Sequence, residues 1–165
     1  MTTPTGTIEQ RDGQHVLVQT RELRAPIEDV WAAVTEPERL ARWIGTWTGN
    51  PASGEVDFRM TFEGDGHPSE QMEIRACEPP RRLHLTSRAG EQVWLIELDL
   101  THADGVTTIT FRQPGVTSDQ VGDVGPGWDY YLDRLVDAET GVDPALRDFD
   151  DYYPATSEHY TAQFG

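Results

Sequence analysis

The residue types that carry acid–base or metal chemistry are present in this chain, but they are not grouped. There are five histidines and one cysteine, Cys77. None of the histidines is spaced from another histidine, from Cys77 or from a carboxylate in a pattern typical of metal ligands. A single cysteine also excludes an intrachain disulfide and a multi-cysteine zinc site. We therefore expect no metal and no other cofactor.

Nucleophilic catalysis has no recognisable motif either. All thirteen basic residues are arginine, which excludes Schiff-base catalysis, a lysine general base and a Walker-type phosphate lysine. No set of Ser, His and Asp is arranged as a catalytic triad, and Gly125–Gly127 is typical of turn chemistry rather than of a phosphate loop. No catalytic residue is assigned, and whether the chain is an enzyme stays open.

Two side chains remain candidates for acid–base chemistry. Glu97 alternates with Val93 and Leu95, a pattern that places it, with Asp99, on the outer face of a strand. Turned inward, such a carboxyl group would have a raised pKa and could act as a general base. His84 is expected to face solvent, and a buried His84 acting in proton transfer is the alternative.

The net charge of −16 restricts the partners of the chain. The last 51 residues hold eleven acidic residues and two arginines, so the negative charge is densest there. Such a field repels nucleic-acid phosphates and anionic lipid headgroups. No run approaches the ~18 apolar residues that span a membrane, and the first residues do not resemble a signal peptide. We expect a cytoplasmic protein that binds no nucleic acid and does not insert into membranes.

The elements that must position any site begin after a loose N-terminal arm, residues 1–13. A strand is expected at His15–Leu23, followed by two short helices that begin near Pro26 and Pro37. After a loop at Thr46–Gly54, five further strands separated by turn residues are expected: Glu55–Phe62, Gln71–Cys77, Leu83–Arg88, Gln92–Thr101 and Val106–Arg112. Connections this short favour antiparallel neighbours.

A final helix is indicated by apolar residues at helical spacing from Trp128 to Val136. Gly141 is a typical stop for it, whereas its start near Gly125–Gly127 is ambiguous. The order predicts an α+β domain at residues 14–141, with a curved antiparallel six-stranded sheet wrapped around this long helix. Residues 142–165 form an acidic tail whose aromatic residues predict that it docks on the domain or on a second subunit.

Several segments resemble a known family. APIEDVWAAVTEPERLARWIG is similar to its opening helix pair, GEVDFRMTFEG to its second strand, ACEPPRRLHLTS to a later strand start and GWDYYLDRL to its long helix. The family is the START-like or SRPBCC superfamily with the birch-allergen-like helix-grip fold, and the branch is that of the heat-shock-protein-90 ATPase activator homologues. The resemblance implies a groove under the long helix that holds lipids, steroids, polyketides or other apolar molecules. It transfers no catalytic residue.

The groove is expected between the last helix and the sheet, because one helix cannot fill the concave face. The alternating apolar row of the fourth of the five strands and the inner face of the helix are its expected lining. Packing as a closed core is the alternative for the same residues. The ligand-binding candidates are Trp94, Ile96, Leu98, Phe111, Gln113, Trp128, Tyr131 and Leu135. Gln113 either orients a polar end of the ligand or ends its strand in solvent.

Three functions stay open on these grounds. The first is a small-molecule-binding protein that holds an apolar or aromatic ligand in the groove. The second is a cyclase- or hydrolase-type enzyme that uses an inward carboxylate or histidine as general acid–base. The third is an interaction module, either in contact with a chaperone or forming a homodimer.

Overall fold

The computed structural model describes residues 3–61, 69–89 and 91–164. The helices are α1 (Ile27–Thr35), α2 (Pro37–Leu40), α3 (Ser118–Thr140) and α4 (Ser157–Thr161). The strands are β1 (Thr7–Arg11), β2 (Gln14–Leu23), β3 (Gly45–Thr48), β4 (Glu55–Met60), β5 (Glu70–Glu78), β6 (Arg82–Ala89), β7 (Gln92–Ala103) and β8 (Val106–Pro114). The predicted strand at 55–62 runs to Met60, and its last residue, Phe62, lies outside the described residues.

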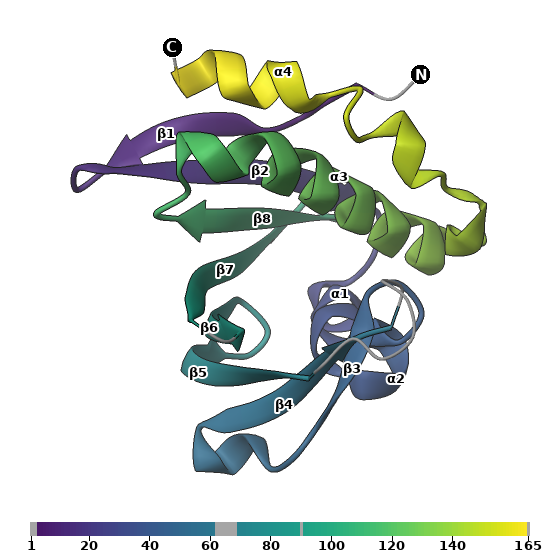
Figure 1. The fold of residues 1–165 in the computed structure, drawn as a ribbon. Coiled ribbons are helices and arrows are strands. Elements are labelled where there is room, and N and C mark those ends of the chain that lie inside the picture. Colours follow the sequence, from purple (N-terminus) through teal and green to yellow (C-terminus); the bar gives the residue numbers. More distant parts are fainter. Residues whose placement is uncertain (1–2, 62–68, 90, 165) are drawn as a thin grey trace.

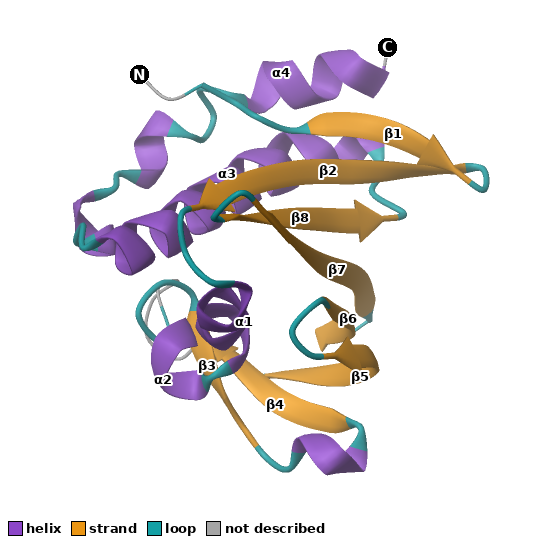
Figure 2. Cartoon of the chain, turned by 180° about the vertical axis from the view of Figure 1, so that it is seen from behind, coloured by secondary structure: helices purple, strands orange, loops and turns teal. Residues whose placement is uncertain are grey.

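The described strands form one antiparallel sheet in the order β1-β2-β8-β7-β6-β5-β4-β3. Figure 1 shows that this sheet is strongly curved, with α3 lying along β2 and β8. Helices α1 and α2 lie near β3 and β4, at the other end of the curve, as Figure 2 also shows from behind. The predicted α+β class, the curved sheet and the long C-terminal helix are confirmed.

The sheet has eight strands in the described residues, not the six predicted, because the N-terminal segment also pairs. Residues Thr7–Arg11, expected to be part of a loose arm, form β1 and pair with β2. The turn between them holds Asp12 and Gly13 at φ values of 53° and 80°, the left-handed geometry of a tight hairpin. The Asp-Gly pair was the sequence signal for this hairpin.

The second additional strand, β3, lies at the start of the segment that was predicted as a loop. It pairs with β4, and Gly45 faces Met60 in that register. A side chain at Gly45 would meet the backbone oxygen of Arg59 at 2.2 Å, so only glycine permits this pairing. Short strands rich in Gly and Thr carry little hydrophobic alternation, and this is why the pattern suggested a loop.

The long helix α3 begins ten residues before Trp128 and runs through Pro126. A proline inside a helix leaves the carbonyl oxygen four residues earlier without its donor. That oxygen belongs to Gly122, and it accepts a hydrogen bond of 2.6 Å from the Ser157 hydroxyl of α4. The C-terminal segment therefore compensates for the proline, and the helix continues to Gly141, whose φ is 84°.

Tyr160 anchors the C-terminal segment on α3. Its ring fits against Gly125, where an added Cβ would lie 2.5 Å away. Its hydroxyl donates to the buried Asp129 carboxylate and accepts from the side-chain amide of Gln19 at 3.0 Å and from the backbone N–H of Gly6 at 3.1 Å. This phenol thus joins β2, α3, α4 and the N-terminal segment, and the tail docks on the domain.

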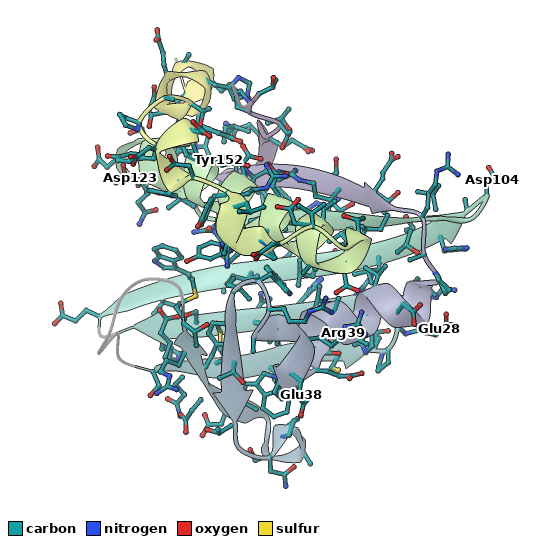
Figure 3. All side chains as sticks on the ribbon, turned by 90° about the vertical axis from the view of Figure 1, so that its right-hand side faces the viewer. Glu28, Glu38, Arg39, Asp104, Asp123 and Tyr152 are labelled. Atoms are coloured by element: carbon teal, nitrogen blue, oxygen red, sulfur yellow. The ribbon has the colours of Figure 1, made fainter. Side chains whose placement is uncertain are left out.

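A buried group of ion pairs also holds α3 against the sheet. Arg21 on β2 contacts Asp129 and Asp133 of α3 at 2.9 Å each, and its side chain is 8% exposed. Tyr152 of the tail, which is labelled in Figure 3, donates to Asp133 at 2.6 Å, so the tail completes this network. Because the charges are paired and hydrogen-bonded, their burial is tolerated.

Replacement of Tyr160 by Phe tests the anchoring of the tail. The variant removes the hydroxyl from three buried partners, so we expect the free energy of unfolding to fall by about 1–3 kcal/mol in urea titration. Tyr153→Phe is the control, because Tyr153 is 38% exposed, and it should change stability by less than about 0.5 kcal/mol. Equal effects of the two variants would contradict the anchoring role.

The same phenol should make the free energy of unfolding depend on pH in the alkaline range. Two causes raise the pKa of Tyr160 above its ordinary value. The larger is burial of the phenol, and the smaller is the neighbouring Asp129 carboxylate. The unfolded phenol ionises near pH ~10 while the folded one stays protonated, so stability is full below that pH and falls as the pH rises above it. The decline should be weaker in Tyr160→Phe than in the unchanged protein. An unchanged slope would show that Tyr160 titrates normally in the folded state.

Candidate functional site

A large cavity lies between α3, the inner face of the sheet and the two short helices. Its volume is about 1090 Å³, slightly above the usual range of small-molecule sites, which is roughly 300–1,000 Å³. Strands β4 to β8, helices α1 and α2, and α3 all contribute to its wall. Aromatic and aliphatic side chains make up most of the lining. An apolar molecule of moderate size therefore has both the room and the chemical surroundings that it needs.

Strand β7 supplies one wall through the alternation of its side chains. Trp94, Ile96 and Leu98 all line the cavity, as the sequence pattern predicts. On β6 their register partners Ser87, Leu85 and Leu83 line it as well, because paired residues of neighbouring strands point to the same face. The inner wall is therefore continuous across both strands.

A β-bulge extends the same wall on β5. The register between β5 and β6 shifts between Ile74 and Ala76. The shift inserts one residue, so that Ile74 and Cys77 both line the cavity although their separation is odd. Cys77 is itself exposed and therefore stands near an opening of the cavity.

The structure divides the eight predicted ligand-binding residues into two groups. Six of them line the cavity: Trp94, Ile96, Leu98, Phe111, Trp128 and Tyr131. Gln113 is 3% exposed and lies outside the lining, where its Oε1 accepts a hydrogen bond of 3.1 Å from the indole Nε1 of Trp128. Leu135 is fully buried in the core and also lies outside the lining. That any of the eight binds a ligand stays a prediction.

The placement of Gln113 differs from both predictions for it. It neither ends the strand in solvent nor faces the cavity, because its side chain is used to fix the Trp128 ring. The same ring lies 4.4 Å from Phe111, centroid to centroid. Gln113 thus contributes to the cavity indirectly, by holding one of its aromatic walls in place.

The residues on the other side of the cavity were not predicted as part of a site from the sequence. Trp31 and Val34 of α1, with Trp43 and Trp47 after it, line that side. The indole N–H groups of Trp43 and Trp47 donate to backbone oxygens of α1, at 3.0 and 2.8 Å. The helical spacing of the apolar residues in α1 was the available signal, but spacing alone does not distinguish a cavity wall from core.

Few polar side chains reach the cavity, and they are not basic. Glu70 begins β5 and is half-buried, and its Oε2 accepts a hydrogen bond of 2.7 Å from the Ser87 hydroxyl. Asp123 of α3 is exposed, at the tail side of the molecule (Figure 3). The indole Nε1 of Trp94 is buried and has no hydrogen-bond acceptor among the residues that the structure describes. Within the described residues no arginine or histidine lines the cavity.

The two acid–base candidates from the sequence lie outside the cavity. Glu97 and Asp99 occupy the outer face of β7, as the alternation predicts, and His84 is beside them with its Nε2 3.2 Å from Asp99. His84 and Glu97 are not solvent-exposed: the His84 side chain is 18% exposed and Glu97 is 7% exposed. Neither can reach a molecule held on the opposite face of the sheet.

Arginine side chains form ion pairs with these outer carboxylates. Arg11 of β1 donates two hydrogen bonds to Glu97, at 3.1 and 3.0 Å. Burial alone would raise the pKa of Glu97, but the bonds and charge of Arg11 lower it below its ordinary value. Arg112 similarly contacts Asp99 at 3.2 Å. Ligand atoms of His84, Glu97 and Asp99 converge within 4.8 Å, yet a metal would have to displace these arginines.

Comparison with known proteins identifies the kind of domain. A sequence model of the family described as Activator of Hsp90 ATPase homolog 1-like protein matches residues 24–138. Comparison with curated proteins gives no significant match.

Among the described residues, no helix combines the length and the apolar character that a membrane crossing needs.

Solved structures of the same fold include three informative cases. CalU16 from Micromonospora echinospora has a TM-score of 0.76 and 23% identity, covering 98% of this chain and 96% of that one. The protein encoded by BPP1335 from Bordetella parapertussis has a TM-score of 0.71 and 26% identity, covering 97% and 91%. DynU16, a protein in the dynemicin biosynthetic locus, has a TM-score of 0.67 and 27% identity, covering 78% of this chain and 49% of that one.

Two leucine variants distinguish the cavity wall from the packed core. Leu135→Ala should create a new void and cost about 2–5 kcal/mol of unfolding free energy. Leu98 is partly exposed and lines an existing space, so Leu98→Ala only enlarges that space. It should cost less than about 2 kcal/mol of unfolding free energy. Urea titration of both variants measures the difference. An equal, large cost at Leu98 would show that the space is filled by protein in solution.

Proposed function

Because the chain belongs to the Activator of Hsp90 ATPase homolog 1-like family of the SRPBCC or helix-grip superfamily, we propose that it binds a small apolar or aromatic molecule between α3 and the sheet. The observation that carries the proposal is the cavity of about 1090 Å³ with its apolar lining. Burial of apolar ligand surface there is favourable at roughly 25 cal/mol per Å² before the costs of association.

The aromatic residues of the wall favour a ligand with flat or aromatic parts. Trp94, Trp128 and Tyr131 present large apolar surfaces, and Trp128 and Tyr131 form an edge-on pair with centroids 6.4 Å apart. DynU16 is a protein of a biosynthetic locus. A small organic biosynthetic product is therefore the ligand class that we would screen first.

Catalysis is supported less well than binding. An enzyme of the cyclase or hydrolase kind needs a titratable group beside the bound substrate. His84 and Glu97, the two candidates from the sequence, lie on the other face of the sheet. The carboxylates that do line the cavity, Glu70 and Asp123, have no histidine or arginine beside them among the described lining residues. The third function, contact with a chaperone or with a second copy, stays a prediction. Leu146 and Phe149 of the C-terminal segment, which are 79% and 41% exposed, are where such a contact would be sought.

A blocked cavity tests the proposal with a matched control. Leu98→Trp fills the cavity from β7, whereas Leu95→Trp adds the same bulk on the outer face of the same strand. The neutral dye N-phenyl-1-naphthylamine, which fluoresces in apolar surroundings, is the probe. We expect Leu98→Trp to weaken its binding at least about tenfold, or about 1.4 kcal/mol, and Leu95→Trp to leave it unchanged.

Circular dichroism of both variants confirms that they fold, and thermal unfolding gives an independent measure. A ligand at ~100 times its dissociation constant should stabilise the unchanged protein by about 2.7 kcal/mol. Equal binding by the Leu98 variant and the unchanged protein would place the dye elsewhere and contradict the proposal.

A further inference from the structure

The charged side chains that line the cavity all have the same sign. Within the described residues they are Glu70 and Asp123, and no arginine accompanies them. This contrasts with the outer face of the sheet, where each of the carboxylates Glu97 and Asp99 is matched by an arginine. A ligand in the cavity therefore meets uncompensated negative charge in apolar surroundings.

Glu70 is the carboxylate that is built into the wall. It begins β5, its side chain bonds to Ser87 of β6, and both residues line the cavity. The Ser87 hydroxyl contacts one carboxylate oxygen, while the other oxygen makes no hydrogen bond in the described part of the chain. A carboxylate oxygen accepts more than one hydrogen bond, so Glu70 has free capacity for a donor on a ligand.

Several hydrogen-bond donors around the cavity are already used by the protein. The indole N–H groups of Trp43, Trp47 and Trp128 donate to protein oxygens, and the Ser87 hydroxyl donates to Glu70. The indole N–H of Trp94 is the exception, since it has no acceptor among the described residues. A ligand carboxylate could accept from this neutral N–H, but it would gain no cationic partner from the described lining and would stand in the field of Glu70. An ammonium group would gain a charge-assisted hydrogen bond at the same place.

We propose that the cavity selects apolar ligands with a cationic ammonium head over neutral alcohols, and excludes carboxylates such as fatty-acid anions, through Glu70. The inference rests on the proposed function, since it names the head group of the ligand that the cavity holds. Ser87 positions the carboxylate of Glu70, and the aliphatic and aromatic wall takes up the remainder of the ligand.

Three probes with the same alkyl chain test the preference: decylamine, decanol and decanoate. Each is used at pH 7, below its micelle concentration, to displace N-phenyl-1-naphthylamine from the full chain. Decylamine is an ammonium and decanoate a carboxylate at this pH. We expect affinity to fall from decylamine to decanol to decanoate, with at least about a tenfold difference between the first and the last.

The overall charge of −16 would also favour a cation, so a matched pair of variants separates the two causes. Glu70→Gln removes the charge in the cavity wall and keeps the shape of the side chain. Glu73→Gln removes an equal charge three residues along the same strand, where the side chain is 48% exposed and lies outside the lining. We expect Glu70→Gln to reduce the decylamine-to-decanoate affinity ratio about tenfold and Glu73→Gln to change it less than about twofold.

Three results would overturn the inference. Two of them leave the proposed binding of apolar molecules intact, and the third contradicts it as well. If decanoate binds as tightly as decylamine, or if Glu70→Gln and Glu73→Gln act equally, the selection by Glu70 is wrong while apolar binding stands. If the dye and all three alkyl probes fail to bind the folded protein, the proposed function fails as well, and the head-group preference fails with it.

Discussion

The structure depends on where α3 is fixed on the curved sheet. Arg21 of β2, buried with the carboxylates of Asp129 and Asp133, holds the helix over β2 at 2.9 Å contacts. Because α3 is bound to this side, the inner faces of β5, β6 and β7 curve away from it, and no second long helix in the described part of the chain covers them. The cavity of about 1090 Å³ is the space that one helix cannot fill. A buried ion pair left with one partner is costly, so the helix position is firmly specified.

The C-terminal segment reinforces that position rather than acting as an appended tail. Ser157 satisfies the carbonyl that Pro126 leaves free, and Tyr160 fits against Gly125 and bonds to Asp129. Phe149 of the same segment lines the cavity. The acidic tail, the N-terminal segment and α3 therefore form one connected support. The strands that form the opposite wall of the cavity, such as β7, face this support and keep their inner faces open.

Much of this arrangement could be predicted from the sequence, and the limits have physical causes. Alternation on β7 placed Trp94, Ile96 and Leu98 on one face, and Glu97 on the other, because a strand has a strict period of two. Tertiary context decided the rest. Whether Leu135 packs as core or Gln113 faces the cavity depends on partners far away in sequence, such as Trp128. The pairing of β3 and the passage of α3 through Pro126 depend on Gly45 and Ser157, whose roles appear only in the fold.

We propose that the space between α3 and β7 is an open site for an apolar molecule. Nuclear Overhauser effects between methyl-labelled protein and bound N-phenyl-1-naphthylamine test it directly. We expect contacts from the dye to methyl groups of Ile96 and Leu98, and none to Leu95 or Leu135. Contacts to Leu95, on the outer face, or saturating amounts of dye without contacts to Ile96 and Leu98, would contradict it.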